Sequence, residues 1–135
     1  MTVIVCVDVQ GGILFNQRRV SSDRAVIFDI LKKAALHPLR IREYSLKLFP
    51  VDAVAYIGDD YFTDATNDDL VFLEDTVADD IWEKADRIVL YCWNRHYPSD
   101  VKFPMEVLRE RGRLESTDTF AGHSNSEITR EVYAL

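Results

Sequence analysis

Two stretches of the chain are apolar almost without interruption, residues 3–7 and residues 88–93. A strand with one wet face alternates apolar and polar side chains, whereas an unbroken run of this length indicates burial on both faces. Both stretches are therefore predicted to be central strands of a sheet that helices cover. The second run stops at the polar stretch 94–98, and the shorter apolar run 70–73 predicts a third buried strand.

A helical pattern follows the first strand. Ser21 or Ser22 can cap a helix whose apolar face extends over residues 25–34, and Asp23 in its first turn suits the positive end of the helix dipole. The helix is expected to end at His37, because Pro38 disfavours helical geometry in the residue before it.

Weaker patterns predict the other elements. The end of the chain begins with a capping box at residues 124–127, and Ile128, Val132 and Leu135 follow at helical spacing. This favours a final helix over residues 124–135, with a strand as the alternative. The remaining expected elements are strands over 39–44, 52–57 and 113–120, helices over 76–84 and 105–111, and irregular connections over 8–19 and 97–104.

The alternation of strands and helices decides the expected fold class. Strands separated by helices imply a mostly parallel sheet with right-handed crossovers. We therefore predict a three-layer α/β sandwich. The length of 135 residues corresponds to a single domain spanning residues 1–135.

The net charge of −7 is unevenly distributed. Residues 1–50 carry four more basic than acidic side chains, residues 51–86 carry eleven more acidic than basic ones, and residues 87–135 are balanced. An acidic middle third argues against a nucleic-acid surface. No apolar run reaches the roughly 18 residues of a membrane helix, and the first residues lack the pattern of a signal peptide, so a cytoplasmic protein without membrane or nucleic-acid partners is expected.

Cysteine and metal chemistry are not predicted. Cys6 and Cys92 each lie inside an apolar strand run, which is typical of reduced core thiols. No Cys/His spacing indicates zinc. An EF-hand loop beginning at Asp64 would need glycine where Asp69 stands and glutamate at Asp75, so the acidic stretch reads as a solvated loop.

Polar residues gather where three predicted strands end. Ligands bind outside the carboxyl ends of parallel strands, so these residues are expected to converge. Arginines there could hold a carboxylate or phosphate, with Trp93, Tyr97 or Phe15 against a planar ring. The alternative is that the arginines are solvated and the aromatic rings are core. The candidate ligand-binding residues are Asp8, Asn16, Arg18, Arg19, Tyr44, Ser45, Asn94, Arg95 and Tyr97.

Three segments together resemble a group of short uncharacterised bacterial proteins. They are residues 8–23, 44–49 and 90–98. Proteins of that group are sometimes labelled ribonuclease Z. The label does not suit this chain, because its three histidines (His37, His96 and His123) are too few and too scattered for a hydrolase with two zinc ions.

A second resemblance is to dihydrofolate reductase. The first strand, the Gly11-Gly12-Ile13 loop and Asp23 at a helix start are similar to the beginning of that family, and residues 85–91 look like its late strand. By this resemblance Asp23 would be the acid that contacts the pterin, serving as proton donor or orienter. Where the family places glycines over the cofactor phosphates, this chain has Leu73-Glu74-Asp75, whose carboxylates would repel a dinucleotide.

The sequence thus leads to three functional hypotheses. The first is a small cytoplasmic α/β protein, with Rossmann-like or dihydrofolate reductase-like topology, that binds a small anionic or planar ligand without a cofactor. The second is a reductase that uses NAD(P)H, with Asp23 as its catalytic candidate. The third is a non-catalytic interaction module, whose uneven charge guides docking to another protein or to a second copy of the chain.

Overall fold

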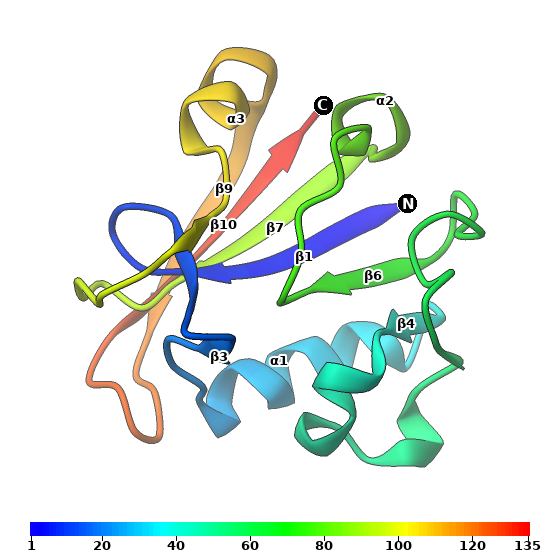
Figure 1. The fold of residues 1–135 in the computed structure, drawn as a ribbon, viewed down its shortest axis with the longest axis horizontal. Coiled ribbons are helices and arrows are strands. Elements are labelled where there is room, and N and C mark those ends of the chain that lie inside the picture. Colours follow the sequence, from blue (N-terminus) through cyan, green and yellow to red (C-terminus); the bar gives the residue numbers. More distant parts are fainter.

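A seven-stranded sheet forms the centre of the computed structural model, which describes residues 1–135 (Figure 1). Strand β1 (Thr2–Val7) lies between β6 (Leu70–Leu73) and β7 (Arg87–Cys92) and runs parallel to both. The predicted apolar strands are therefore neighbours. Their burial on both faces follows from this central position.

The sheet is extended on both sides. Beyond β6 come β4 (Leu39–Ile41) and β5 (Tyr56–Ile57), both parallel to their neighbours. Beyond β7 come β10 (Ile128–Ala134) and β9 (Arg113–Phe120), both antiparallel. The prediction of an α/β fold with a mostly parallel central sheet is confirmed.

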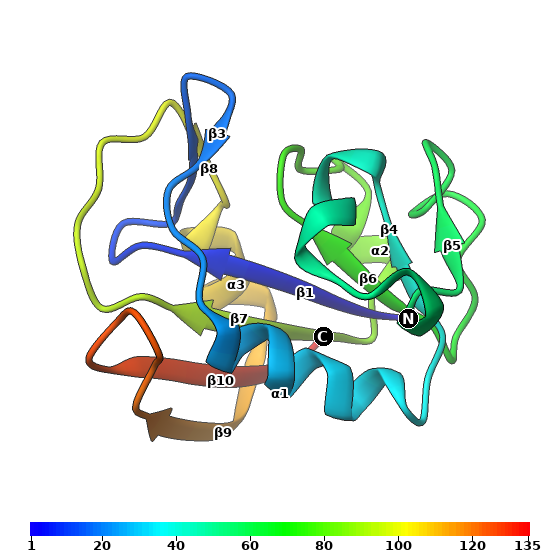
Figure 2. The ribbon, with the colours of Figure 1, turned by 90° about the horizontal axis from the view of Figure 1, so that it is seen from below.

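The helices cover the two faces of the sheet. On one face α1 (Arg24–Ala34) packs Val26 and Ile30 into a core cluster with Ile4 of β1. On the other face α2 (Ile81–Lys84) and α3 (Met105–Arg111) pack Ile81 and Leu108 against neighbouring residues of the same strand. The three layers are visible in Figure 1, and Figure 2 shows α1 running along one side of the strands. No helix is both long and apolar enough to span a membrane.

The prediction of a final helix is wrong. Residues Ile128–Ala134 form β10, which is hydrogen-bonded to β7 on one side and to β9 on the other. The spacing of four residues between Ile128 and Val132 suits one face of a helix but also one face of a strand. Pairing decides between the two, because β10 covers the edge of β7 that would otherwise remain open.

Other boundaries differ from the expected ones. Helix α1 ends at Ala34 rather than His37, and the expected helix over 76–84 is reduced to one turn, Ile81–Lys84. The expected strand over 52–57 is replaced by the 3₁₀ helix η2 (Val51–Ala53) and the two-residue strand β5. A short 3₁₀ helix, η1 (Glu43–Leu48), follows β4 in place of the rest of the strand expected over residues 39–44.

A small second sheet replaces the two irregular connections. It contains β3 (Arg18–Arg19), β2 (Gly12–Phe15) and β8 (Val101–Lys102) in that order. Asn16 and Gln17 form the hairpin turn with φ angles of 50° and 64°. Two positive φ angles are typical of the tight turns whose twist matches a β-hairpin. The β2–β3 hairpin extends beyond the carboxyl end of β1.

Candidate functional site

The two loops at the carboxyl ends of β1 and β7 meet as predicted. The carboxylate of Asp8 accepts hydrogen bonds from the backbone N–H groups of Tyr97 (3.0 Å), Gln10 (2.8 Å) and Gly12 (2.7 Å). Burial opposes the ionisation of Asp8, but these three donors outweigh it and hold its pKa below the usual value. The buried carboxylate is therefore engaged in holding the loops together.

The other polar side chains of these loops do not converge around a shared cavity. Asn94 is exposed and donates to Oγ1 of Thr129 at 2.9 Å. Asn16, Arg18 and Arg95 are exposed as well. Trp93, expected to pack against a ligand ring, is instead part of the core beneath α1. That these residues bind a ligand stays a prediction, and the five main surface pockets are lined by other residues.

A second polar network occupies the carboxyl ends of β1, β6 and β4. Arg19 reaches from the β2–β3 hairpin to Glu74, to which it donates two hydrogen bonds, and its guanidinium lies 4.9 Å from the ring centre of Tyr44. Ser45 donates to the same carboxylate at 2.7 Å. The helices that follow β1 and β6 cover opposite faces of the sheet, so a crevice is expected between these strand ends. In this protein the Arg19–Glu74 ion pair occupies the position of that crevice.

Both thiols are free, as the sequence indicated, but neither is fully buried. Cys6 lies near the Arg19–Glu74 pair. Burial, followed by the negative charge of Glu74, raises the pKa of the Cys6 thiol, and burial also raises the pKa of Cys92. Raised pKa values keep both groups in the thiol form, which is the unreactive one.

Asp23 caps α1 and also anchors the loop before β10. Its carboxylate accepts five hydrogen bonds, from the backbone N–H groups of Ala25, His123, Ser124 and Asn125 and from the side-chain amide of Asn125. Burial opposes its ionisation, yet these donors lower the pKa of Asp23 far below its usual value. The acid suggested as a catalytic group is thus ionised, and its hydrogen-bonding capacity is used within the fold.

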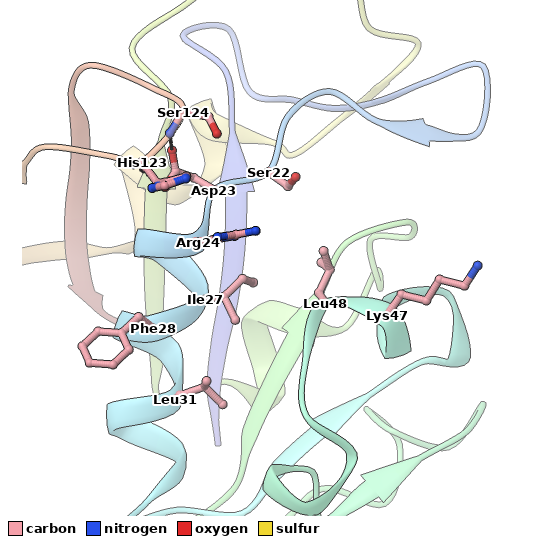
Figure 3. A pocket seen from close by; sticks show the side chains of 10 residues that line it. All are labelled: Ser22, Asp23, Arg24, Ile27, Phe28, Leu31, Lys47, Leu48, His123 and Ser124. Carbon is pink, nitrogen blue, oxygen red and sulfur yellow. Dashed lines mark hydrogen bonds between the residues drawn. The ribbon is translucent and has the colours of Figure 1, made fainter.

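A groove lies beside this anchored loop, between α1 and η1 (Figure 3). Its volume is about 560 Å³. In Figure 3, Ile27 and Leu31 of α1 point toward Leu48 across the gap, Arg24 lies above them, and Phe28 points away on the other side of the helix. The lining residues are Ser22, Asp23, Arg24, Ile27, Phe28, Leu31, Lys47, Leu48, His123 and Ser124.

Comparison with solved structures relates the whole chain to one known architecture. A dihydrofolate reductase from Enterococcus faecalis, complexed with NADP(H) and RAB-propyl, superposes with a TM-score of 0.66 and 12% identity. The match covers 99% of this chain and 95% of the other. The fold is dihydrofolate reductase-like. No protein-family model and no curated protein sequence matched the chain, so the resemblance to the group labelled ribonuclease Z has no support beyond its motifs.

Of the candidate site residues, only Asp23 lines the groove. Arg24, Lys47, Leu48 and His123 were not singled out from the sequence. The spacing of Ile27 and Leu31 indicated a helix face, but nothing in the sequence shows that η1 packs opposite that face. The groove is created by tertiary contact between two segments about twenty residues apart, and the loop at residues 123–124 closes one end of it.

Proposed function

We propose that this protein binds a small, planar organic anion in the groove between α1 and η1. The observation that carries the proposal is the combination of apolar walls with cationic side chains that form no ion pair. Ile27, Leu31 and Leu48 supply the walls. Arg24 extends from α1 toward the gap and supplies the charge, while Lys47 lies on the η1 side with its ammonium directed away from α1 (Figure 3). Neither is within ion-pair distance of an acidic group.

The only acid in the lining does not oppose an anion strongly. The Asp23 carboxylate is surrounded by five donors, and its charge is spread over the hydrogen bonds to the loop and to the first turn of α1. The hydroxyl groups of Ser22 and Ser124 and the ring of His123 stand at the same end and can donate hydrogen bonds to a ligand. Pockets with apolar walls and a few polar groups are typical of small-molecule sites.

The test is calorimetric and NMR titration with aromatic carboxylates, using benzoate and 2-naphthoate as probes. Saturable binding is expected, with perturbed signals from Ile27 and Leu48. The variant R24Q should weaken binding several-fold, up to about tenfold, because it removes a charge-assisted contact. K47Q should weaken binding less, because the Lys47 ammonium is directed away from the gap. R18Q and K102Q are matched controls on the small sheet and should bind like the unmodified protein.

If R18Q rather than R24Q weakens binding, the ligand lies at the strand ends that the sequence first suggested. If neither probe saturates, the groove is not a site for aromatic anions and the proposal is wrong.

The reductase remains the second candidate, and its support is the likeness of fold alone. The Arg19–Glu74 pair and the adjacent Asp75 occupy the carboxyl ends of the central strands and argue against a dinucleotide there. We expect no NADPH binding in a fluorescence titration at micromolar concentrations. Saturable binding, followed by hydride transfer to a substrate, would make the reductase the better account.

A further inference from the structure

A second basic pocket lies at the opposite edge of the sheet, under the C-terminal half of α1. Its volume is about 540 Å³. Thr2, Leu70 and Arg87, which are the first residues of β1, β6 and β7, line one side of it. It is thus the amino edge of the parallel strands, away from the Arg19–Glu74 network and separate from the groove between α1 and η1.

The charges of this pocket are predominantly positive. Lys32, Lys33, Arg87 and Arg130 line it, and Asp29 is the single acid of the lining. Outside the lining, Glu115 pairs with Arg87 and Asp118 with Arg130. Arg130 donates to both oxygens of Asp29 at 2.9 and 2.8 Å, and the hydroxyl of Tyr91 donates to the same carboxylate. The acid is therefore neutralised by groups of the fold.

Three cations remain for a ligand. Lys32 and Lys33 form no ion pair, and the ammonium of Lys32 lies 4.9 Å from the ring centre of Phe28. Arg87 uses only its Nε in a hydrogen bond, to Glu115 at 2.9 Å. A guanidinium carries five N–H donors, so most of its capacity is available.

Apolar side chains complete the pocket. Val89 and Val132 of adjacent strands lie in its lining together with Leu36, which follows α1 and is 79% exposed. An exposed leucine beside unpaired lysines suits an amphiphilic ligand. The apolar part of such a ligand covers the leucine and valine side chains, and its charged group contacts the cations.

We propose that this pocket binds a phosphate monoester with an apolar body. Arg130 is paired with Asp29 and Asp118, which leaves three cations for a ligand, the two unpaired lysines and the free N–H groups of Arg87. Several cations around one neutralised acid favour a dianion over a singly charged carboxylate. The valine and leucine walls favour an alkyl or aryl ester over inorganic phosphate. The inference does not depend on the ligand of the groove between α1 and η1.

The experiment is an NMR titration of methyl-labelled protein with phenyl phosphate, followed by calorimetry. Saturable shifts are expected at Leu36, Val89 and Val132, and inorganic phosphate and benzoate should bind at least several-fold more weakly. The double variant K32Q/K33Q should lose about tenfold or more in affinity, since two charge-assisted contacts disappear. K102Q is the control for a lysine elsewhere, and R24Q/K47Q tests whether the probe uses the other groove.

Each outcome decides the proposal. Binding that survives K32Q/K33Q, or that is lost in R24Q/K47Q with shifts at Ile27 and Leu48, overturns it, as does a titration without saturation. If inorganic phosphate binds as tightly as phenyl phosphate, the apolar walls do not contribute to affinity, and the proposed ligand class is wrong. Melting temperatures of all variants should be close to that of the unmodified protein, because the substituted lysines and Arg24 form no ion pairs.

Discussion

The carboxyl edge of the parallel strands and the flanks of α1 both carry charged side chains but use them differently. Asp8 and Glu74 at the strand ends, and Asp23 at the start of α1 on the same edge, are buried and accept several hydrogen bonds each. On the flanks of α1, Arg24 and Lys32 form no ion pair and stand beside apolar side chains. A polar cluster at strand ends is thus no evidence for a ligand until its hydrogen bonds have been counted.

The difference has an energetic basis. A buried carboxylate that lost its donors would be costly, so each one at the strand ends is matched by N–H or O–H groups of the fold. An exposed lysine or arginine remains hydrated and needs no partner. Such a cation is available to a ligand at little cost to the folded state.

The largest effect is expected at Asp23. Its replacement by alanine removes the cap of α1 and leaves the loop at residues 123–125 without its acceptor, which should lower the free energy of unfolding by about 3 kcal/mol or more. Urea denaturation measures this. D23N keeps one acceptor oxygen and should cost less, while S22A, beside it, should change little. A cost of D23A no larger than that of S22A would contradict the structural role of the carboxylate.

The next effect is expected at the Arg19–Glu74 pair. R19M leaves Glu74 with Ser45 as its remaining donor and should destabilise the protein by about 2 kcal/mol. The double variant R19M/E74M should cost less than the sum of the two single variants, because no unpaired charge remains. R18M is the matched control on the same hairpin. Additive effects in this cycle would mean that the two side chains are not coupled.

Acid should weaken the protein through the same carboxylates. The pKa values of Asp8, Asp23 and Asp29 are lowered, in spite of burial, by hydrogen bonds and, for Asp29, by Arg130. A carboxyl group whose pKa is lower in the folded than in the unfolded protein stabilises the folded state at pH values above the unfolded-state pKa of about 3.9. This stabilisation is lost as the pH falls through the folded-state pKa. Unfolding free energy should therefore decline below about pH 4, and less steeply in D23N. A flat profile from pH 5 to pH 3 would contradict this assignment.

The smallest effects on stability are expected on the flanks of α1. R24Q, K47Q and K32Q should each change the free energy of unfolding by less than about 0.5 kcal/mol, because these exposed side chains form no ion pair. The same variants are predicted to change ligand affinity. Thermal denaturation of each variant tests the expected small change in stability. A large loss of stability would show that these cations support the fold, as the carboxylates at the strand ends do.

Much of the fold could be predicted because its central strands are apolar on both faces. The runs at residues 3–7 and 88–93 indicated buried strands without any knowledge of their partners. The start of α1 was predicted to within two residues, but the expected cap was wrong: Asp23, and not Ser21 or Ser22, caps the helix, because its carboxylate accepts from the N–H of Ala25. The meeting of the loops after β1 and β7 followed from parallel pairing of these strands and is confirmed by the bond from Tyr97 to Asp8.

The end of the chain and the site could not be predicted in the same way. Ile128 and Val132 have a spacing that both a helix and a strand accept, so only the vacant edge beside β7 selects β10. Arginines and carboxylates have the same local signature whether they bind a ligand or each other. The sequence by itself determined the apolar strands, the first helix and the placing of polar residues at strand ends. Tertiary structure alone decided which charges neutralise one another and which remain exposed beside α1, because that depends on distances between segments far apart in the chain.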